Sequence, residues 1–263
     1  MLEISNLSKT FNKNTINEKI ALDHINLTLK EGDFVTVIGG NGAGKSTLLN
    51  AICGAWNIDA GKILLDGINI TNMADYKRAK FLGRVFQDPM MGTAGEMEIA
   101  ENLAIANRRS KRRTLRWGMK KQEKANYQTL LAQLDLGLEN RLTSKVGLLS
   151  GGQRQALTLL MATLQKPKLL LLDEHTAALD PPKPAAKFLE ITDRIVSEKN
   201  LTTIMITHNM KDAIAHGNRL IMMNEGKIIA DISGAEKEKL TVEDLLRMFE
   251  NSGTTVNDSA ILA

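Results

Sequence analysis

Hydrophobic and polar residues alternate along much of the first 70 positions, as they do in strands with one buried face. The segment 34–38 is almost continuously apolar, which predicts a strand buried on both faces. Asp66 and Gly67 stand between two strand-like segments and are typical of a hairpin turn. The pattern therefore predicts a β-rich region over 1–70, with strands at 2–7, 21–29, 34–38, 61–65 and 68–70.

The pattern changes between residues 90 and 158, where the chain is charged and rich in helix-forming residues. Apolar positions such as Leu130, Leu131 and Leu134 recur at the spacing of one helix face. We therefore expect a separate helical subdomain here.

Helix and strand patterns alternate again between residues 159 and 230. The apolar stripe within 188–196 predicts a helix with one face in the core, and 219–230 predicts a closing hairpin. Thr241 and Asp244 have the spacing of a helix-capping box, which predicts one more helix start.

One segment in this pattern carries recognisable chemistry. Residues 39–46 read Gly-Gly-Asn-Gly-Ala-Gly-Lys-Ser, the phosphate-loop pattern, between the strand 34–38 and a helix predicted over 45–52. Such glycines let successive N–H groups turn inward around a polyphosphate, and the helix adds its positive N-terminal end. Lys45 would reach the terminal phosphates and Ser46 a magnesium ion. The expected nucleotide-binding residues are Gly39, Gly40, Asn41, Gly42, Ala43, Gly44, Lys45, Ser46 and Thr47.

Composition indicates the cellular compartment in which this site would work. No apolar run approaches the ~18 residues of a membrane-spanning helix, so we expect no membrane span. The single cysteine, Cys53, cannot form an intrachain disulfide, which favours a reducing compartment.

The formal net charge of +4 is mild, but basic residues concentrate between positions 108 and 121. Trp117 is the one aromatic residue among them, and no nucleic-acid recognition module surrounds them. A solvated face and a surface near anionic lipid headgroups are the favoured interpretations, and nucleic-acid binding is not expected.

Further motifs appear in a fixed order after the phosphate loop. The sequence Leu-Ser-Gly-Gly-Gln at 149–153 resembles the signature of ATP-binding cassette (ABC) proteins. Gln87 lies in a stretch that resembles the Q-loop of that family, and 169–174 resembles its Walker B strand. Asp180 lies in a segment like the D-loop, and His208 matches the switch histidine. The resemblance runs from about residue 1 to residue 250.

The resemblance implies a role for each matching residue. Phe11 would stack on the adenine ring, and ATP would be bound with Mg²⁺. Glu174 would act as the general base, directed away from Asp173 because neighbouring strand residues face opposite ways. His175 departs from the proline that is usual in the family. The implied catalytic residues are Glu174, His208 and Gln87, and the implied magnesium ligands are Ser46, Gln87 and Asp173.

In the family, the signature completes the ATP site of the opposite subunit. The chain would therefore form a homodimer, or pair with a related cassette, with two ATP molecules in the interface. The residues expected to act in this way are Leu149, Ser150, Gly151, Gly152 and Gln153.

The resemblance also implies the fold and its division. We expect an α/β P-loop NTPase with a RecA-like core, an antiparallel β subdomain and an inserted α-helical subdomain, as one ABC ATPase domain over 1–250. The core with its β subdomain would comprise 1–89 and 159–235, and the helical signature subdomain 90–158. Residues 251–263 would form a loose C-terminal tail.

The function implied is that of an ATP-hydrolysing subunit that powers a separate integral-membrane permease. The segment 141–148 lacks the acidic residue common in exporter cassettes, which favours an importer. An extracytoplasmic solute-binding protein would be a further partner, and the cytoplasmic face of the membrane the location.

The segments 173–180, 207–210 and 217–223 resemble bacterial cassettes described as tryptophan/tyrosine transport ATP-binding proteins. An amino acid is therefore the candidate solute, by analogy. The alternatives are an exporter subunit and a soluble cassette protein that acts on ribosomes or DNA. A single cassette without coiled-coil heptads favours transport.

Overall fold

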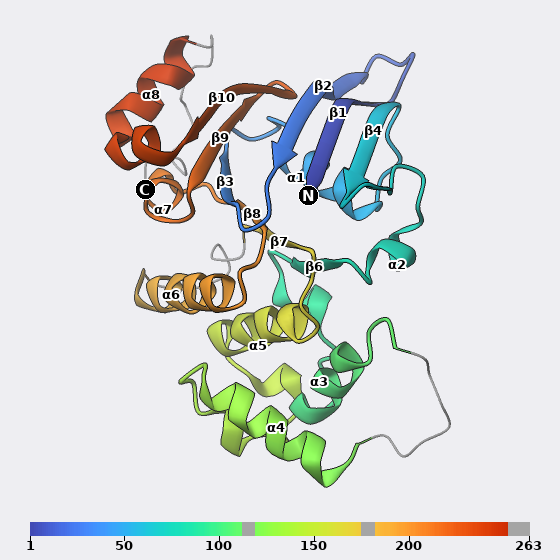
Figure 1. Ribbon diagram of the computed structural model, residues 1–263, viewed down its shortest axis with the longest axis vertical. Coiled ribbons are helices and arrows are strands. Elements are labelled where there is room, and N and C mark those ends of the chain that lie inside the picture. The colour runs from blue at the N-terminus through green and yellow to red at the C-terminus, as the bar shows by residue number, and fades with distance from the viewer. Residues whose placement is uncertain (112–118, 175–181, 252–263) are drawn as a thin grey trace. The chain divides into compact units, whose positions relative to one another are not determined.

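The computed structural model describes residues 1–111, 119–174 and 182–251, apart from the side chains of 182–184. The chain divides into two compact units (Figure 1). The first, called the nucleotide unit below, comprises Met1–Arg78 and Asn200–Ala263, and the second, called the signature unit, comprises Ala79–Lys199. The subdomain bounds expected from the sequence stay a prediction.

An antiparallel sheet makes up one part of the nucleotide unit, in the strand order β2-β1-β4-β5. Leu2 and Ile4 of β1 are buried while Glu3 between them is exposed, so the alternation seen in the sequence marks one buried face. Asp66 and Gly67 both have positive φ, 49° and 74°, which is the conformation that a two-residue hairpin turn requires. The strands are β1 (Leu2–Phe11), β2 (Lys19–Leu29), β4 (Ala60–Leu65) and β5 (Ile68–Asn69).

The other strands of this unit lie in the order β10-β9-β3-β8. The central strand β3 runs parallel to β8 and β9, and β10 closes the edge antiparallel to β9. All five residues of β3 are buried, which explains its nearly continuous apolar sequence. The bounds are β3 (Phe34–Ile38), β8 (Thr203–Ile206), β9 (Arg219–Asn224) and β10 (Lys227–Ser233).

Helices α7 and α8 pack on this sheet around one apolar cluster that includes Ile38, Leu220 and Phe249. The capping box expected before α8 is confirmed, because Thr241 N donates to Asp244 Oδ2 at 3.0 Å and Asp244 N to Thr241 Oγ1 at 3.2 Å. The helices of the unit are α1 (Lys45–Cys53), α2 (Asp75–Arg78), α7 (Met210–Ala215), the 3₁₀ helix η4 (Gly234–Lys239) and α8 (Val242–Asn251).

The signature unit combines two parallel strands, β6 (Leu82–Val85) and β7 (Leu169–Asp173), with helices that pack around α5. The apolar stripe expected on α6 is buried at Phe188, Ile191 and Ile195. The helices are η1 (Pro89–Gly92), α3 (Ile99–Asn107), α4 (Lys121–Ala132), η2 (Leu138–Asn140), η3 (Val146–Leu148), α5 (Gly151–Thr163) and α6 (Pro182–Glu198).

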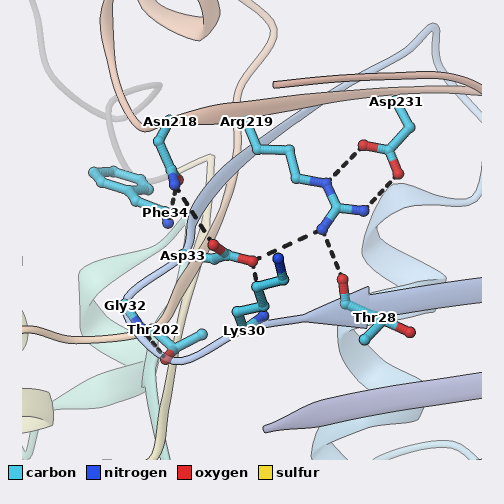
Figure 2. Close-up of polar contacts among 9 residues, drawn as sticks. All are labelled: Thr28, Lys30, Gly32, Asp33, Phe34, Thr202, Asn218, Arg219 and Asp231. Atoms are coloured by element: carbon cyan, nitrogen blue, oxygen red, sulfur yellow. Dashed lines mark hydrogen bonds and ion pairs between the residues drawn. The ribbon is translucent and has the colours of Figure 1, made fainter. Parts of the chain in front are cut away.

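A polar network ties the two sheets of the nucleotide unit together at the start of β3 (Figure 2). The guanidinium of Arg219 binds the Asp231 carboxylate through Nε and Nη2 at 2.6 and 2.5 Å, and Nη1 donates to the Thr28 carbonyl at 2.6 Å. Asp33 lies 3.8 Å from Nη1, and the Asp231 hydrogen bonds raise the pKa of Arg219. The network connects β2 of one sheet to β9 and β10 of the other where β3 begins.

Arg219→Met should lower the free energy of unfolding by about 1–3 kcal/mol, because a partly buried charged donor is lost from two carboxylates and a carbonyl. Urea-induced unfolding measures the difference. Lys227→Met is the control, since it removes an ion pair to Asp23 whose lysine is 63% exposed, and should cost less than about 1 kcal/mol. Equal losses in the two variants would contradict a structural role for the network.

Candidate functional site

The phosphate loop, Gly39–Ser46, joins the end of β3 to the start of α1 and is packed tightly against neighbouring backbone. A Cβ on Gly39 would lie 2.3 Å from the Met223 carbonyl oxygen, and one on Gly44, whose φ is +103°, would lie 2.4 Å from that of Ala21. Glycine is therefore required at both positions by space, and at Gly44 also by backbone conformation.

Two cationic side chains border the loop. Lys45 is 5% exposed, and its ammonium donates to the carbonyls of Gly39 at 2.7 Å and Gly40 at 3.2 Å. The ammonium of Lys19 lies 2.8 Å from where a Cβ on Gly42 would stand. Helix α1 has no acidic residue in its first turn, so none of its own carboxylates offsets its positive end. The arrangement suits a polyanion, and Lys19 had no signal in the sequence.

His208 lies at the same sheet edge as the phosphate loop. It follows β8, which runs parallel to β3, and Thr207 N donates to the Val37 carbonyl at 3.2 Å. Asn209 then caps α7 by accepting from Lys211 N at 2.8 Å. Strand, turn and cap together hold His208 next to the end of β3.

Phe11 ends β1 in an aromatic pair that the sequence did not predict. Its ring forms a T-shaped pair with Trp56, with centroids 4.9 Å apart and an interplanar angle of 82°. Trp56 is 38% exposed, and the ammonium of Lys9 lies 5.3 Å from the centre of the Phe11 ring. The pair gives an aromatic surface on which a base could stack.

The acidic residues belong to the signature unit. Asp173 ends β7, and its carboxylate accepts from Arg84 Nη2 on β6 at 3.1 Å. Gln87 is exposed just after β6, so it lies at the edge where both parallel strands end. Glu174 has φ of 43° and follows the strand, so a left-handed turn and not strand alternation directs its side chain.

The signature is the N-terminal cap of α5. Ser150 Oγ accepts from Gln153 N at 3.3 Å, and Gln153 Oε1 accepts from Ser150 N at 3.2 Å, which makes a capping box. Arg154 Nη2 donates to the carbonyls of Gly147 and Leu149, both at 3.0 Å, and steadies the preceding turn. The helix therefore presents its positive end behind an ordered Ser-Gly-Gly segment.

Two residues of the basic cluster, the arginines and lysines between positions 108 and 121, have structural partners. Arg108 pairs with Glu123 at 3.2 Å, and Arg109 Nη2 donates to the carbonyls of Ala162 at 3.1 Å and Gln165 at 3.2 Å. His175, Asp180 and the cluster residues at 112–118 lie outside the described residues.

The expected site residues thus fall into two groups, each described within its own unit. The nucleotide unit holds Phe11, the phosphate loop and His208, and the signature unit holds Gln87, the signature, Asp173 and Glu174. Among described residues, no three or more His, Cys, Asp or Glu side chains gather as a metal site. In the same part of the chain, no helix is both long and apolar enough to cross a membrane.

Comparison with known proteins gives several matches. The family model described as ABC transporter matches residues 22–177. A tyrosine transport ATP-binding protein of Clostridioides difficile is 48% identical over 95% of this chain and 99% of its own length. A spermidine/putrescine import ATP-binding protein of Haemophilus influenzae is 34% identical over 90% of this chain, which spans 59% of that relative.

Solved structures agree with these matches. A dimeric ATP-binding cassette in a post-hydrolysis state, bound to ADP and phosphate, matches with a TM-score of 0.75 and 26% identity over 89% of this chain and 98% of that one. A cassette of an ABC transporter in its ADP conformation matches with a TM-score of 0.76 and 27% identity over 95% and 98%. The predicted α/β P-loop fold is confirmed.

Gly44→Ala should weaken nucleotide binding at least about tenfold, because the new methyl group collides with the Ala21 carbonyl and strains a left-handed residue by about 1–2 kcal/mol. Gly40→Ala is the matched control, since a Cβ there meets nothing within 4 Å. Titration with a fluorescent ADP analogue measures both. If the two variants bound alike, close packing would not be what shapes the loop.

Proposed function

The chain belongs to the ABC transporter family as an ATP-binding ATPase subunit, and we propose that it acts as a dimer of cassettes that drives uptake of an amino acid through a separate permease. The observation that carries the nucleotide role is the glycine loop with buried Lys45 at the positive end of α1. We retain the division into a core, 1–89 with 159–235, and a helical subdomain, 90–158, as part of the proposal.

ATP is held mainly by the nucleotide unit. The phosphate loop from Gly39 to Ser46, continued by Thr47, surrounds the phosphates with N–H groups, and Lys45 turns from the loop carbonyls to the terminal phosphates. Phe11 stacks on the adenine, supported by Trp56 at 4.9 Å. His208 contacts the γ-phosphate from the end of β8.

The three proposed ligands have the donor chemistry that a magnesium ion prefers. Ser46, Gln87 and Asp173 offer a hydroxyl, an amide and a carboxylate oxygen, which are hard donors. One carboxylate suits this metal, because Mg²⁺ usually keeps waters and binds substrate phosphates besides one or two carboxylates. When bound, the ion neutralises phosphate charge. Glu174 orients the attacking water as general base, and its left-handed backbone separates its direction from that of Asp173.

The signature residues Leu149–Gln153 act on the ATP held by the opposite subunit. The positive end of α5 and the Ser150 hydroxyl suit an approaching γ-phosphate. Binding of ATP then closes the dimer and hydrolysis opens it. Asp180 belongs to this interface as the D-loop residue.

The permease docks on an exposed apolar surface of the signature unit. Met90, Met91 and Leu148 are 43, 70 and 71% exposed. Gly147 N donates to Gly95 O at 2.8 Å, and a Cβ on Gly95 would lie 3.1 Å from Met90 Cε, so Met90 lies beside Gly95, which pairs with the residue before Leu148. Gln87 precedes this surface and connects it to the catalytic residues.

The transporter is an importer on the cytoplasmic face of the membrane and works with an extracytoplasmic solute-binding protein. The names of two relatives support import, since they are spermidine/putrescine import and methionine import ATP-binding proteins. The relative at 48% identity points to an aromatic amino acid as the solute.

Glu174→Gln should keep ATP binding but lower turnover by about 10²–10⁴-fold, because only the water-orienting base is lost. The ATP-bound dimer should then persist during size-exclusion chromatography with light scattering. Ser150→Arg in the same background should abolish that dimer without weakening nucleotide binding. Substantial turnover by Glu174→Gln, or dimers that survive Ser150→Arg, would contradict the proposal.

Met91→Glu should abolish permease binding and transport while the affinity for ATP stays within about twofold, since an exposed charge changes docking and not the pocket. Co-purification with the permease and uptake by reconstituted vesicles provide the measurement. Tyr76→Glu is the control, because Tyr76 is similarly exposed, at 72%, but lies in the other unit. Parallel losses of ATP binding and transport would place Met91 in the nucleotide site instead.

A further inference from the structure

A mostly buried ion pair connects Asp173 to a residue that the proposed function does not use. Arg84 Nη2 lies 3.1 Å from Asp173 Oδ2, and the two side chains are 18 and 13% exposed. Arg84 comes from β6 and Asp173 from the parallel neighbour β7. In such surroundings each charge depends on its partner, because water screens the pair poorly.

The same guanidinium also contacts the segment that leads into Gln87. Its Cζ lies 4.5 Å from the centre of the Phe86 ring, within the range of a cation–π interaction. Arg84 therefore touches both the carboxylate that ends β7 and the aromatic residue that follows β6.

Phe86 continues this contact to the signature helix. Its carbonyl oxygen accepts from Nε2 of Gln155, a fully buried residue of α5 two positions after the signature. The Gln155 Oε1 atom is buried with no hydrogen-bond partner among the described residues. The bond to Phe86 is therefore what orients this amide.

We propose that Arg84 is a positioning residue that transmits the binding of a metal ion at Asp173 to the signature helix through Phe86 and Gln155. The inference rests on the proposed role of Asp173 as a magnesium ligand. The guanidinium of Arg84 is repelled when a divalent cation shares that carboxylate, so the ion pair weakens. The cation–π contact with the Phe86 ring then contributes more to holding the guanidinium. Arg84 and the cation thus compete for Asp173. When the cation binds, Arg84 moves and Phe86 shifts against α5.

Competition predicts tighter metal binding once the charge of Arg84 is removed. In the full chain saturated with ADP, Arg84→Met should raise the affinity for Mn²⁺ roughly fivefold or more, as measured by electron paramagnetic resonance of the free ion. Arg84→Lys keeps the charge and should bind Mn²⁺ more weakly than Arg84→Met. The control is Arg108→Met, which breaks another ion pair of the same unit, at 3.2 Å, and should leave the affinity unchanged. If Arg84→Met bound Mn²⁺ with unchanged affinity, the proposed competition for Asp173 would be wrong.

Hydrogen exchange tests the connection to α5 separately. Adding Mn²⁺ with ADP to the wild-type chain should change amide exchange at 84–87 and in the first two turns of α5. Gln155→Met removes the hydrogen bond to Phe86, so it should change the Mn²⁺ affinity less than Arg84→Met does and lose the change in α5. A wild-type chain without that change, or a variant that retains it, would overturn the connection.

Asp173→Ala separates this inference from the proposed function. If Asp173→Ala leaves Mn²⁺ binding unchanged, the metal role of Asp173 is wrong and the inference falls with it. If Asp173→Ala weakens Mn²⁺ binding while Arg84→Met changes nothing, the metal role stands and only the competition is wrong.

Discussion

The close approach of backbone to backbone at the phosphate loop is the constraint on which the nucleotide unit depends. A Cβ on Gly39 would lie 2.3 Å from the Met223 carbonyl oxygen, and one on Gly44 2.4 Å from that of Ala21. Those carbonyls belong to β9 and β2, so the loop takes its shape from both sheets of the unit. Only when both sheets are in place can α1 and Lys45 present a fixed positive surface.

Cationic side chains at the ends of helices support the fold within each of the two units. Arg78 is 3% exposed and donates to the last carbonyls of α1, at Ala51 and Ile52, both at 2.8 Å. Lys199 reaches the last carbonyl of α5, on Thr163, at 2.9 Å. Carbonyls at a helix C-terminus carry partial negative charge, so a buried cation gains partners there and the helix gains a cap.

One residue of the basic cluster also binds carbonyls at the end of a helix. Arg109 binds carbonyls near the end of α5, and Arg108 pairs with Glu123 in the first turn of α4. These two residues act inside the fold, which favours structural support over a recognition surface at those positions. A count of positive charges cannot distinguish the two, because Arg109 binds backbone carbonyls distant in sequence and Arg108 binds a carboxylate on the next helix.

Several features of this protein could be predicted from the sequence because they depend on interactions between nearby residues. The strand β3, the hairpin turn at Asp66 and Gly67 and the capping box at Thr241 were predictable because each depends on residues a few positions apart. The glycine loop and the order of motifs likewise identified the family without coordinates. Tertiary structure alone decided the partners of Arg84, the pairing of Phe11 with Trp56 and the left-handed turn at Glu174. Those features depend on which strands become neighbours and where each strand ends, and hydrophobic periodicity carries no information about either.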